Sequence, residues 1–541
     1  MHSHGSSTLP RCGVAALPAA LSPITVRPCW TADQQTQHLS CASALARGCS
    51  RTSVVAGLSV LAIGWCQSMS SRSKHKGLSA SRGQPVEHAK SVEATIETLQ
   101  SWMEEAQLVM AVTNKGLEAP VARELAFFHE TESAAWCGWA MIWHQQLSTH
   151  MGKAVFGNRL YFPWRGEGRC PVVHGASRLL AVFAVLLGKD LQKVRDAKDP
   201  NASFASYVAH AARQNLRQSL PAYMVLCAEK EDDPGANPPG RTISFTADCR
   251  VGQGGAERLA LGDRADWVRL KQGLRQGIQD AAGWVLQPRA ANAEVSVWAF
   301  FAPDHVALGV EVKEVETHQA PAILWSRLPR PGMQTQIAGA MAALAAECVA
   351  TMDGPSIVVD PTCGMGTLLL AAARVWPQVS GRPLRLVGRE MNPSQLQKCY
   401  SNFSSCHLDM SDVQLKDGRD PKSFTELPDA SVDALLCDLP SGAAHKASSD
   451  LEHLGGLRSY SSFLRLAERI VRPGGRCVLL SERKEMLTRR ISSSSWQTVA
   501  SWVIGRGEGN TLEFLLIALE RVTESDGPHV QDITPLYIRD N

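Results

Sequence analysis

The sequence "IVVDPTCGMGTLLLAAA", residues 357–373, runs from a short apolar segment through a glycine-containing turn into a leucine- and alanine-rich segment. The apolar segment predicts a buried β-strand, and the residues after Gly366 predict a helix. Glycine at positions 364 and 366 lets the backbone of the turn pass close to a ligand. The stretch therefore predicts a strand–turn–helix unit that carries a ligand site in an α/β domain.

The same alternation of strand and helix continues along the chain. A predicted helix over 331–350 precedes the first strand, and further Val- and Leu-rich runs occupy 384–390, 413–420, 432–438 and 476–482. Short buried strands that alternate with helices are typical of parallel β-α units. We therefore predict a doubly wound, Rossmann-like sheet over residues 330–525, followed by a tail over 526–541.

Acidic residues stand at or just beyond the ends of four predicted strands: Asp360, Glu390, Asp417 and Asp438. In a doubly wound sheet, ligands bind beyond the carboxyl ends of the strands. A dinucleotide fingerprint would need a third glycine where this chain has Leu369, and an acid at the turn repels a pyrophosphate. S-adenosylmethionine, which carries an ammonium group and a sulfonium, is the cofactor that fits these residues.

Two of these acids have individual predicted roles. Glu390 is placed to accept hydrogen bonds from two ribose hydroxyls, and Asp417 to accept one from an adenine amino group. The alternative is a solvated acid at a strand end, and Asp412 and Asp420 compete with Asp417 for its role. The predicted cofactor-binding residues are Asp360, Thr362, Cys363, Gly364, Gly366, Thr367, Glu390, Asp417 and Asp438.

The segment "DALLCDLPSG", residues 433–442, predicts the catalytic group. The lone pair of an exocyclic base amine is delocalised into the ring, so methylation requires both N–H groups to be held. The Asp438 carboxylate and the Leu439 carbonyl can accept these two bonds, and Pro440 fixes the backbone that presents the carbonyl. The alternative is an ordinary Asp-x-Pro turn at a strand end.

Residues 100–325 show a different, α+β pattern. Predicted helices cover 92–107, 175–188 and 265–286, an exposed loop covers 229–240, and a strand–turn–helix unit covers 108–128. Further strands are predicted over 159–164 and 241–250, and two strands within 294–313. This region has neither an acid/base constellation nor metal-ligand spacing, and no C-x-x-C pair occurs in the chain, so we predict a binding module without a metal site.

Residues 1–90 are predicted to lie outside the fold, as a transit peptide or as an unstructured extension ahead of a start at Met69. Residues 1–86 hold eight Lys or Arg and a single acid, which leaves 47 basic and 51 acidic residues in the remainder. The body is therefore not broadly basic, and nucleic-acid contact requires a local patch. No apolar run reaches the roughly 18 residues of a membrane span.

From about residue 105 to 520 the chain resembles the THUMP-domain RNA guanine-N2 methyltransferases. The segments that carry the resemblance are "VTNKGLEAPVAREL", "ISFTADC", "LPRPGMQTQIAGAMAALA", "DPTCGMGTLLLAAA", "VGREMNPSQL", "SVDALLCDLPSG" and "RPGGRCVLLSE". Their order and spacing make the resemblance more specific than any single motif.

The resemblance implies a class I enzyme that uses S-adenosylmethionine to form N2-methylguanosine in structured RNA, either tRNA or a U6-type small nuclear RNA. It also implies a small zinc-containing activator subunit, a THUMP-containing RNA-binding region at 100–325, and a location in the cytoplasm or nucleus, with organellar import through residues 1–90 left open. By the same resemblance, the family's cofactor loop corresponds to Asp360, Cys363, Gly364 and Gly366, its ribose-binding acid to Glu390, and its catalytic acid and proline to Asp438 and Pro440.

The chain departs from the family pattern at Ser441, where the family has a Phe or Tyr that stacks on the target base. Such stacking contributes about 1–3 kcal/mol, so we expect Tyr460, Phe463 or an arginine to replace it. His445 and Lys446 are candidate phosphate contacts beside Ser441. Two alternatives remain: a catalytically weak RNA-binding scaffold, and an amino-methyltransferase that acts on a protein glutamine or a DNA adenine.

Overall fold

The computed structural model describes most residues between 99 and 522. Within this span the main gaps are 144–158, 228–242, 252–263, 313–332 and 440–448. The predicted N-terminal extension, the 229–240 loop and the 526–541 tail lie outside the described residues. So do Pro440, Ser441, His445 and Lys446.

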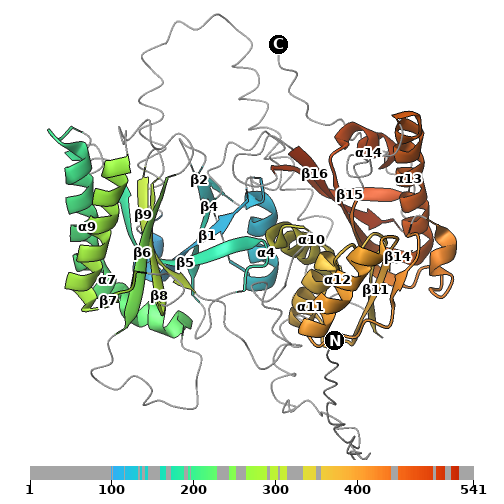
Figure 1. The fold of residues 1–541 in the computed structure, drawn as a ribbon, viewed down its shortest axis with the longest axis horizontal. Coiled ribbons are helices and arrows are strands. Elements are labelled where there is room, and N and C mark those ends of the chain that lie inside the picture. Colours follow the sequence, from blue (N-terminus) through green and yellow to red (C-terminus); the bar gives the residue numbers. More distant parts are fainter. Residues whose placement is uncertain are drawn as a thin grey trace, which may run out of the picture. The chain divides into compact units, whose positions relative to one another are not determined.

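The C-terminal half of the chain forms a seven-stranded sheet in the order β12-β11-β10-β13-β14-β16-β15 (Figure 1). The strands are β10 Ser356–Asp360, β11 Leu384–Glu390, β12 Val413–Leu415, β13 Val432–Asp438, β14 Val471–Ser481, β15 Trp496–Gly505 and β16 Glu513–Arg521. The first five in the order are parallel, whereas β16 is antiparallel to both β14 and β15. The prediction of a doubly wound α/β sheet is confirmed, with an antiparallel pair added at one edge.

Helices cover both faces of this sheet. They are α10 Thr335–Ala346, α11 Thr367–Val379, α12 Pro393–Ser405, α13 Ser449–Ile470 and α14 Lys484–Ile491, with the 3-10 helix η4 at Pro421–Phe424. Val358 packs in one core cluster with residues of α10 and α11, and its neighbour Val359 packs in another with residues of α13 and α14. Because both faces are buried, the central strands are rich in apolar residues and show no regular polar alternation.

The direction of strand addition reverses between β10 and β13. The chain first places β11 and β12 on one side of β10, and then β13 and β14 on the other. Ligands of doubly wound sheets bind at such a switch point, beyond the carboxyl ends of the strands. The topology therefore predicts a ligand site formed by the residues that follow β10 and β13.

The N-terminal half forms a nine-stranded, mostly antiparallel sheet in the order β3-β2-β4-β1-β5-β9-β8-β6-β7. Its strands are β1 Gln107–Thr113, β2 Ala134–Trp136, β3 Met141–Trp143, β4 Arg159–Trp164, β5 Ala176–Leu187, β6 Ser244–Val251, β7 Val285–Leu286, β8 Val295–Phe301 and β9 His305–Val312. The helices are α4 Glu118–His129, α7 Pro200–Cys227 and α9 Arg264–Ala282. The structure confirms the predicted strand–turn–helix unit and the two strands around residues 303–304.

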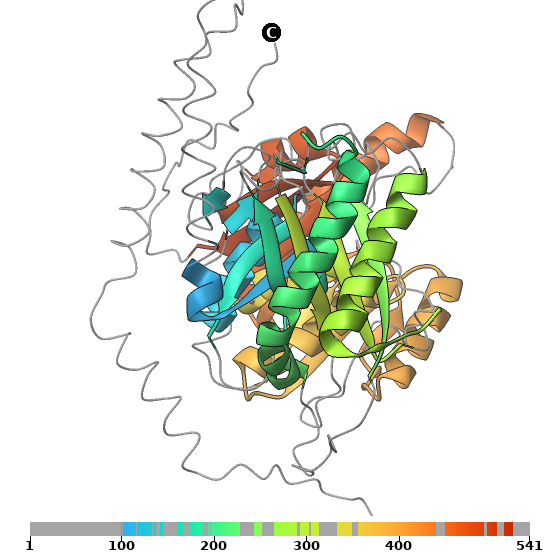
Figure 2. The same cartoon turned by 90° about the vertical axis from the view of Figure 1, so that its left-hand side faces the viewer.

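Helices α7 and α9 lie side by side over one face of this sheet (Figures 1 and 2). Gly273 and Gly277 of α9 allow this close approach because they lack a Cβ atom. A Cβ at Gly273 would lie 2.5 Å from the carbonyl oxygen of Ala205, and one at Gly277 would lie 2.7 Å from that of Ala209. The 28-residue helix α7 has no counterpart among the predicted elements.

The prediction of a helix over 175–188 is wrong, because residues 176–187 form strand β5. Successive side chains of β5 enter different cores: Leu180 and Val182 pack in one cluster, and Ala181 and Phe183 in another. A strand buried on both faces has no polar alternation, so its apolar run has the same appearance as a buried helix.

Helix α10 joins the two sheets. Arg123 of α4 forms a two-point ion pair with Glu347, with a 2.6 Å distance between Nε and Oε1. Asn114 hydrogen-bonds Gln334 at the start of α10, and Gly339 lies directly against the carbonyl of His174. One hydrophobic cluster runs through β1, α4, α10 and the C-terminal sheet.

Among the described residues, no helix is both long enough and apolar enough to cross a membrane.

Candidate active site

The structure brings the predicted strand-end acids to one edge of the C-terminal sheet. Asp360, Glu390 and Asp438 are the last residues of β10, β11 and β13, and Asp417 follows the end of β12. These strands are parallel and adjacent, so their carboxyl ends share an edge. The negative charges of Asp438 and Glu390 both act on the carboxyl group of Asp360.

The glycine turn after β10 has two positions in the left-handed region of backbone space. Gly366, with φ of 81°, packs against α12, and a Cβ there would lie 2.6 Å from the Cys399 Sγ. Gly364, with φ of 53°, faces space in which an added Cβ would meet no atom of another described residue, apart from its two chain neighbours, within 4 Å. Gly366 therefore fits the turn to the protein, whereas Gly364 leaves room for a ligand.

Glu390 holds this turn through its carboxylate. One oxygen accepts a hydrogen bond from the Gly364 backbone N–H at 3.0 Å, and the other from the Asn392 N–H at 2.6 Å. A carboxylate has about four lone-pair sites, so Glu390 can also accept from ribose hydroxyls. The Asn402 side chain donates to the Met365 carbonyl and holds the turn from the α12 side.

Burial and neighbouring charge set the protonation of Asp360. Its side chain is buried, and one oxygen accepts the Thr362 backbone N–H at 3.0 Å. Desolvation, reinforced by the negative charges of Asp438 and Glu390, raises the pKa of Asp360 to about 8. A positively charged ligand beside these carboxylates would favour their ionised forms. The site therefore suits a cation such as a sulfonium or an ammonium group.

Asp438 is half-buried and is held at its backbone from two sides. The Thr362 hydroxyl donates to the Asp438 carbonyl at 3.4 Å, and the following Leu439 N–H donates to the Leu480 carbonyl of β14 at 2.9 Å. Thr362 thus connects the turn after β10 with the end of β13. The positions that sequence reasoning ties to the cofactor and to catalysis are neighbours in the fold.

Asp417 also lies at this turn. The adjacent Gly418 packs so closely on the carbonyl of Pro361 that a side chain would not fit there. The Asp417 carbonyl accepts bonds from the Asp420 N–H at 3.1 Å and from the Ser423 hydroxyl at 2.7 Å, which fix the loop. Its side chain is half-buried beside the predicted cofactor loop.

The two acids that compete with Asp417 in the sequence have structural partners. Asp412 forms a two-point ion pair with Arg385, at 2.8 and 3.0 Å. Asp420 caps η4 by accepting the Lys422 N–H at 3.0 Å. These contacts give Asp412 and Asp420 structural roles away from the turn after β10.

The rings considered as replacements for the missing aromatic are core residues. Tyr460 is buried and shares a 2.9 Å hydrogen bond between its hydroxyl and the Ser481 hydroxyl. Phe463 is buried in the cluster between α13 and the sheet. The expectation that one of these rings stacks on a substrate base is therefore not supported.

Sequence reasoning missed the residues that support the turn from α12. Cys399, Asn402 and Phe403 are buried behind Gly366 and Met365. Their spacing in α12 is that of ordinary core residues, so no local signal connects them to the turn. In the described part of the chain, no group of three or more His, Cys, Asp or Glu residues is arranged to hold a metal ion.

Residues 330–509 match the family model "RMKL-like, methyltransferase domain". This segment contains every described site residue. The match supports S-adenosylmethionine as the cofactor and agrees with the predicted class I methyltransferase fold.

Curated relatives lie among guanine-N2 methyltransferases. The chain is 29% identical over 240 residues to "U6 snRNA (guanine-N(2))-methyltransferase THUMPD2" of Bos taurus, a match covering 44% of this chain and 40% of that protein. It is 28% identical over 162 residues to "tRNA (guanine(6)-N(2))-methyltransferase THUMP3" of Mus musculus, covering 27% and 30%. The matches thus span less than half the length of these relatives. They confirm the predicted resemblance to the THUMP-domain guanine-N2 methyltransferases.

A solved structure with a similar arrangement is TrmN from Thermus thermophilus. The similarity has a TM-score of 0.49 at 20% sequence identity, and it covers 77% of this chain and 100% of that one.

Proposed function

We propose that this protein transfers the methyl group of S-adenosylmethionine to the exocyclic N2 atom of a guanosine in structured RNA, either tRNA or a U6-type small nuclear RNA. The observation that carries the proposal is the convergence of Asp360, Glu390 and Asp438 on one sheet edge, beside a glycine turn that leaves space at Gly364. The match of residues 330–509 to a methyltransferase family and the names of the relatives support it.

The residues of the turn provide the cofactor site. S-adenosylmethionine supplies an activated methyl group and a positive charge. Gly364 gives backbone access, Glu390 accepts from the ribose hydroxyls, and Asp417 accepts from the adenine amino group. The buried Asp360 supplies negative charge close to the end of β13. Thr362 keeps this half of the site in register with Asp438 through its 3.4 Å bond to the Asp438 carbonyl.

Asp438 and Leu439 provide the acceptor site. The Asp438 carboxylate and the Leu439 carbonyl accept the two N–H bonds of the guanine amine, which orients its nitrogen for attack. Pro440 restricts the backbone that presents the carbonyl. The amine becomes acidic only after methylation, so Asp438 accepts the departing proton without having to be a strong base.

The remaining parts of the proposal concern the RNA, the partner and the cell. The α+β module at 100–325 binds the folded RNA, and the domain at 330–525 carries out the methylation. A small zinc-containing activator subunit assists the reaction. The protein acts in the cytoplasm or nucleus, with residues 1–90 as an optional organellar address.

A catalytically weak RNA-binding scaffold is the second candidate, and Ser441 favours it. Loss of the stacking aromatic removes about 1–3 kcal/mol of base binding. Such a protein would bind S-adenosylmethionine and RNA and release no methylated nucleoside.

Transfer of a tritiated methyl group to total small RNA, with the activator subunit present, tests the proposal. We expect N2-methylguanosine from the wild type by nucleoside mass spectrometry and at least a hundredfold lower rate from Asp438→Ala. Asp429→Asn is the matched control, because Asp429 is an exposed acid of the same domain, paired with Arg469. Equal rates in the wild type and Asp438→Ala would refute the assigned role of Asp438. A methylated protein glutamine or DNA adenine as the only product would change the substrate class.

A further inference from the structure

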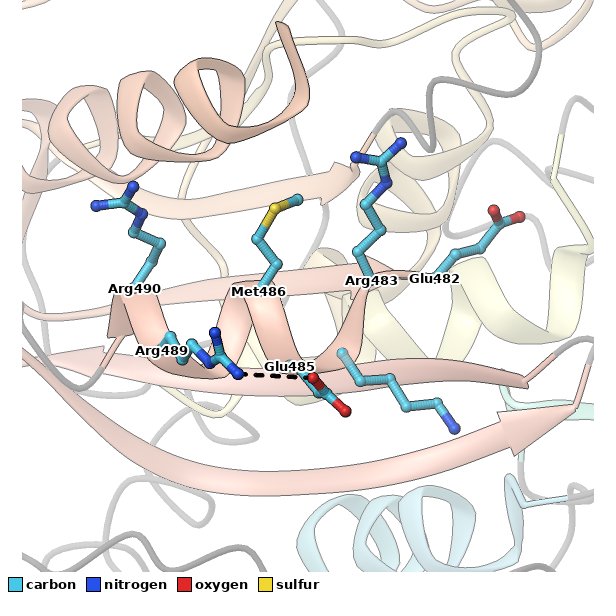
Figure 3. Close-up of a pocket in the computed structure, with 7 residues that line it drawn as sticks. Glu482, Arg483, Glu485, Met486, Arg489 and Arg490 are labelled. Atoms are coloured by element: carbon cyan, nitrogen blue, oxygen red, sulfur yellow. Dashed lines mark ion pairs between the residues drawn. The ribbon is translucent and has the colours of Figure 1, made fainter. Parts of the chain in front are cut away.

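A hollow of about 720 Å³ lies where the chain leaves β14 and enters α14 (Figure 3). Among the described residues, the side chains that line it all come from the segment 482–490, and four of them are basic and two acidic: Glu482, Arg483, Lys484, Glu485, Met486, Arg489 and Arg490. The chain beyond residue 86 carries more acids than bases, so this concentration of cations is local.

Two contacts fix the position of α14. The buried Ser481 hydroxyl accepts the Arg483 backbone N–H at 3.0 Å, which shapes the turn after β14. Leu487 and Ile491, four residues apart, are buried in the core cluster beneath the helix. This anchoring leaves the charged faces of α14 at the surface. The positions of these cations are thus set by a packed element.

The side chains divide between two sides of the helix. In Figure 3, Arg483, Met486 and Arg490 point to one side, as their spacing of three and four residues predicts. On the other side Arg489 pairs with Glu485 at 3.8 Å, and both side chains are largely exposed. An exposed ion pair of this kind is weak. It therefore competes little with a phosphate for Arg489.

The hollow begins at the same edge of the sheet as the acceptor site. Strand β14 is parallel to β13 and pairs Leu480 with Asp438, and Leu439 N–H donates to the Leu480 carbonyl at 2.9 Å. Neighbouring strands are about 4.8 Å apart. The turn at 482–483 begins two residues, about 7 Å, beyond Leu480 along the chain, and it lies at the same edge of the sheet as the proposed catalytic acid.

We propose that this hollow binds the phosphate backbone of the RNA strand that carries the target guanosine. The inference rests on the proposed RNA methyltransferase function and deepens it. Arg483 and Arg490 present planar forks of donors that match phosphate oxygens, and Lys484 adds a compact positive charge. Met486, between the two arginines, offers an apolar contact for a ribose or a base. Cations at the same sheet edge as Asp438 would hold the strand while the base enters the site.

The test measures RNA binding by the full chain with its activator subunit as a function of salt. The probes are an end-labelled tRNA transcript and a U6 transcript, and the test variant is Arg483→Gln/Arg490→Gln. The matched control is Lys398→Gln/Arg465→Gln, which removes two exposed cations from α12 and α13. Circular dichroism and thermal denaturation verify that both variants are folded, and calorimetry measures their affinity for S-adenosylmethionine.

We expect the test variant to bind the better RNA probe at least about tenfold more weakly at 100 mM KCl. The slope of log K against log salt should fall by about 0.7 per removed cation for single-stranded RNA. KM for RNA should rise while the affinity for S-adenosylmethionine stays within twofold of the wild type. The control variant should keep the wild-type slope.

Three outcomes separate the inference from the proposed function. If the wild type methylates RNA but the test variant has the slope and affinity of the control, the hollow does not bind the backbone. If cofactor affinity falls with RNA affinity, the arginines act on the fold of the site and the inference is overturned. If the wild type neither binds nor methylates either RNA, the proposed function fails, and this inference fails with it.

Discussion

The two glycines of the turn after β10 make a paired prediction, because they share a backbone conformation and differ in surroundings. Gly364→Ala and Gly366→Ala each place a Cβ at a positive φ, which costs about 1–2 kcal/mol. Part of that cost is offset by the lower entropy of the unfolded chain, by about 0.4–1 kcal/mol. At Gly364 no steric cost is added, because among the described residues, apart from its chain neighbours, an added Cβ meets no atom within 4 Å.

At Gly366 the added methyl meets the core. Its Cβ would lie 2.6 Å from the Cys399 Sγ and 2.9 Å from the Phe403 Cε2, and both residues are fully buried. Overpacking of this kind costs about 1–3 kcal/mol more. One kcal/mol lowers Tm by about 2–4 °C in a domain of 150–250 residues. The net cost is about 0–1.6 kcal/mol at Gly364 and about 1–4.6 kcal/mol at Gly366, so we expect Tm to fall by at most about 6 °C for Gly364→Ala and by about 2–18 °C for Gly366→Ala.

For cofactor affinity we expect the opposite order, with the larger loss in Gly364→Ala and the smaller loss in Gly366→Ala. The methyl of Gly364→Ala occupies the space assigned to S-adenosylmethionine, so we expect its affinity to fall at least about tenfold in a variant that remains folded. Differential scanning fluorimetry gives the Tm values, and isothermal titration calorimetry at a temperature where both variants are folded gives the affinities. Wild-type affinity in Gly364→Ala, or equal loss of stability in the two variants, would refute this reasoning.

Two other predictions follow from buried carboxylates. The pKa of Asp360 is raised to about 8 in the fold, so the folded protein holds a proton that the unfolded chain releases above about pH 4. Stability without ligand should therefore fall as the pH rises from about 4 to 8, and binding of the cationic cofactor should release a proton below pH 8, seen as buffer-dependent heats that vanish in Asp360→Asn. Asp433 is buried and forms an ion pair with Arg472, with 2.9 Å between its Oδ1 and the arginine Nη2. Asp433→Ala should cost about 3–5 kcal/mol in chemical denaturation, because it leaves a buried cation unpaired. Asp280→Ala, which removes the exposed partner of Arg213, should cost at most about 1 kcal/mol.

The C-terminal sheet could be predicted from the sequence because its signals are local. Strands β10, β11 and β13 are five to seven residues long, each contains a short apolar run, and each ends in an acid. Each is buried on both faces, so a continuous apolar run suffices to identify it when helices lie between the runs. The same rule failed at β5, where twelve residues without alternation are long enough for a helix.

Other features depend on contacts between distant segments. The antiparallel strands β15 and β16 pair with each other and with β14, and nothing in their own residues shows that they extend a parallel sheet. Tyr460 looked available for base stacking in the sequence, but its hydroxyl is bonded to Ser481 in the core. The support of Gly366 by Cys399 and Phe403 arises because α12 packs behind the turn. Local patterns do not encode such contacts.

The strand-end acids are all carboxylates at the same edge of the sheet, but their different surroundings indicate different roles. Glu390 holds backbone N–H groups of the turn with both oxygens, and Asp360 is buried with its pKa raised to about 8. Both belong to the β10–β11 side of the switch point. Asp438 is half-buried at the end of β13, and the neighbouring strand β14 leads into the basic hollow. If the cofactor binds on the β10–β11 side and the RNA strand on the β13–β14 side, substitutions of Glu390 should lower the affinity for S-adenosylmethionine and leave the affinity for RNA unchanged. Changes at Arg483 or Arg490 should do the reverse, and Asp438 should affect the rate more than either affinity.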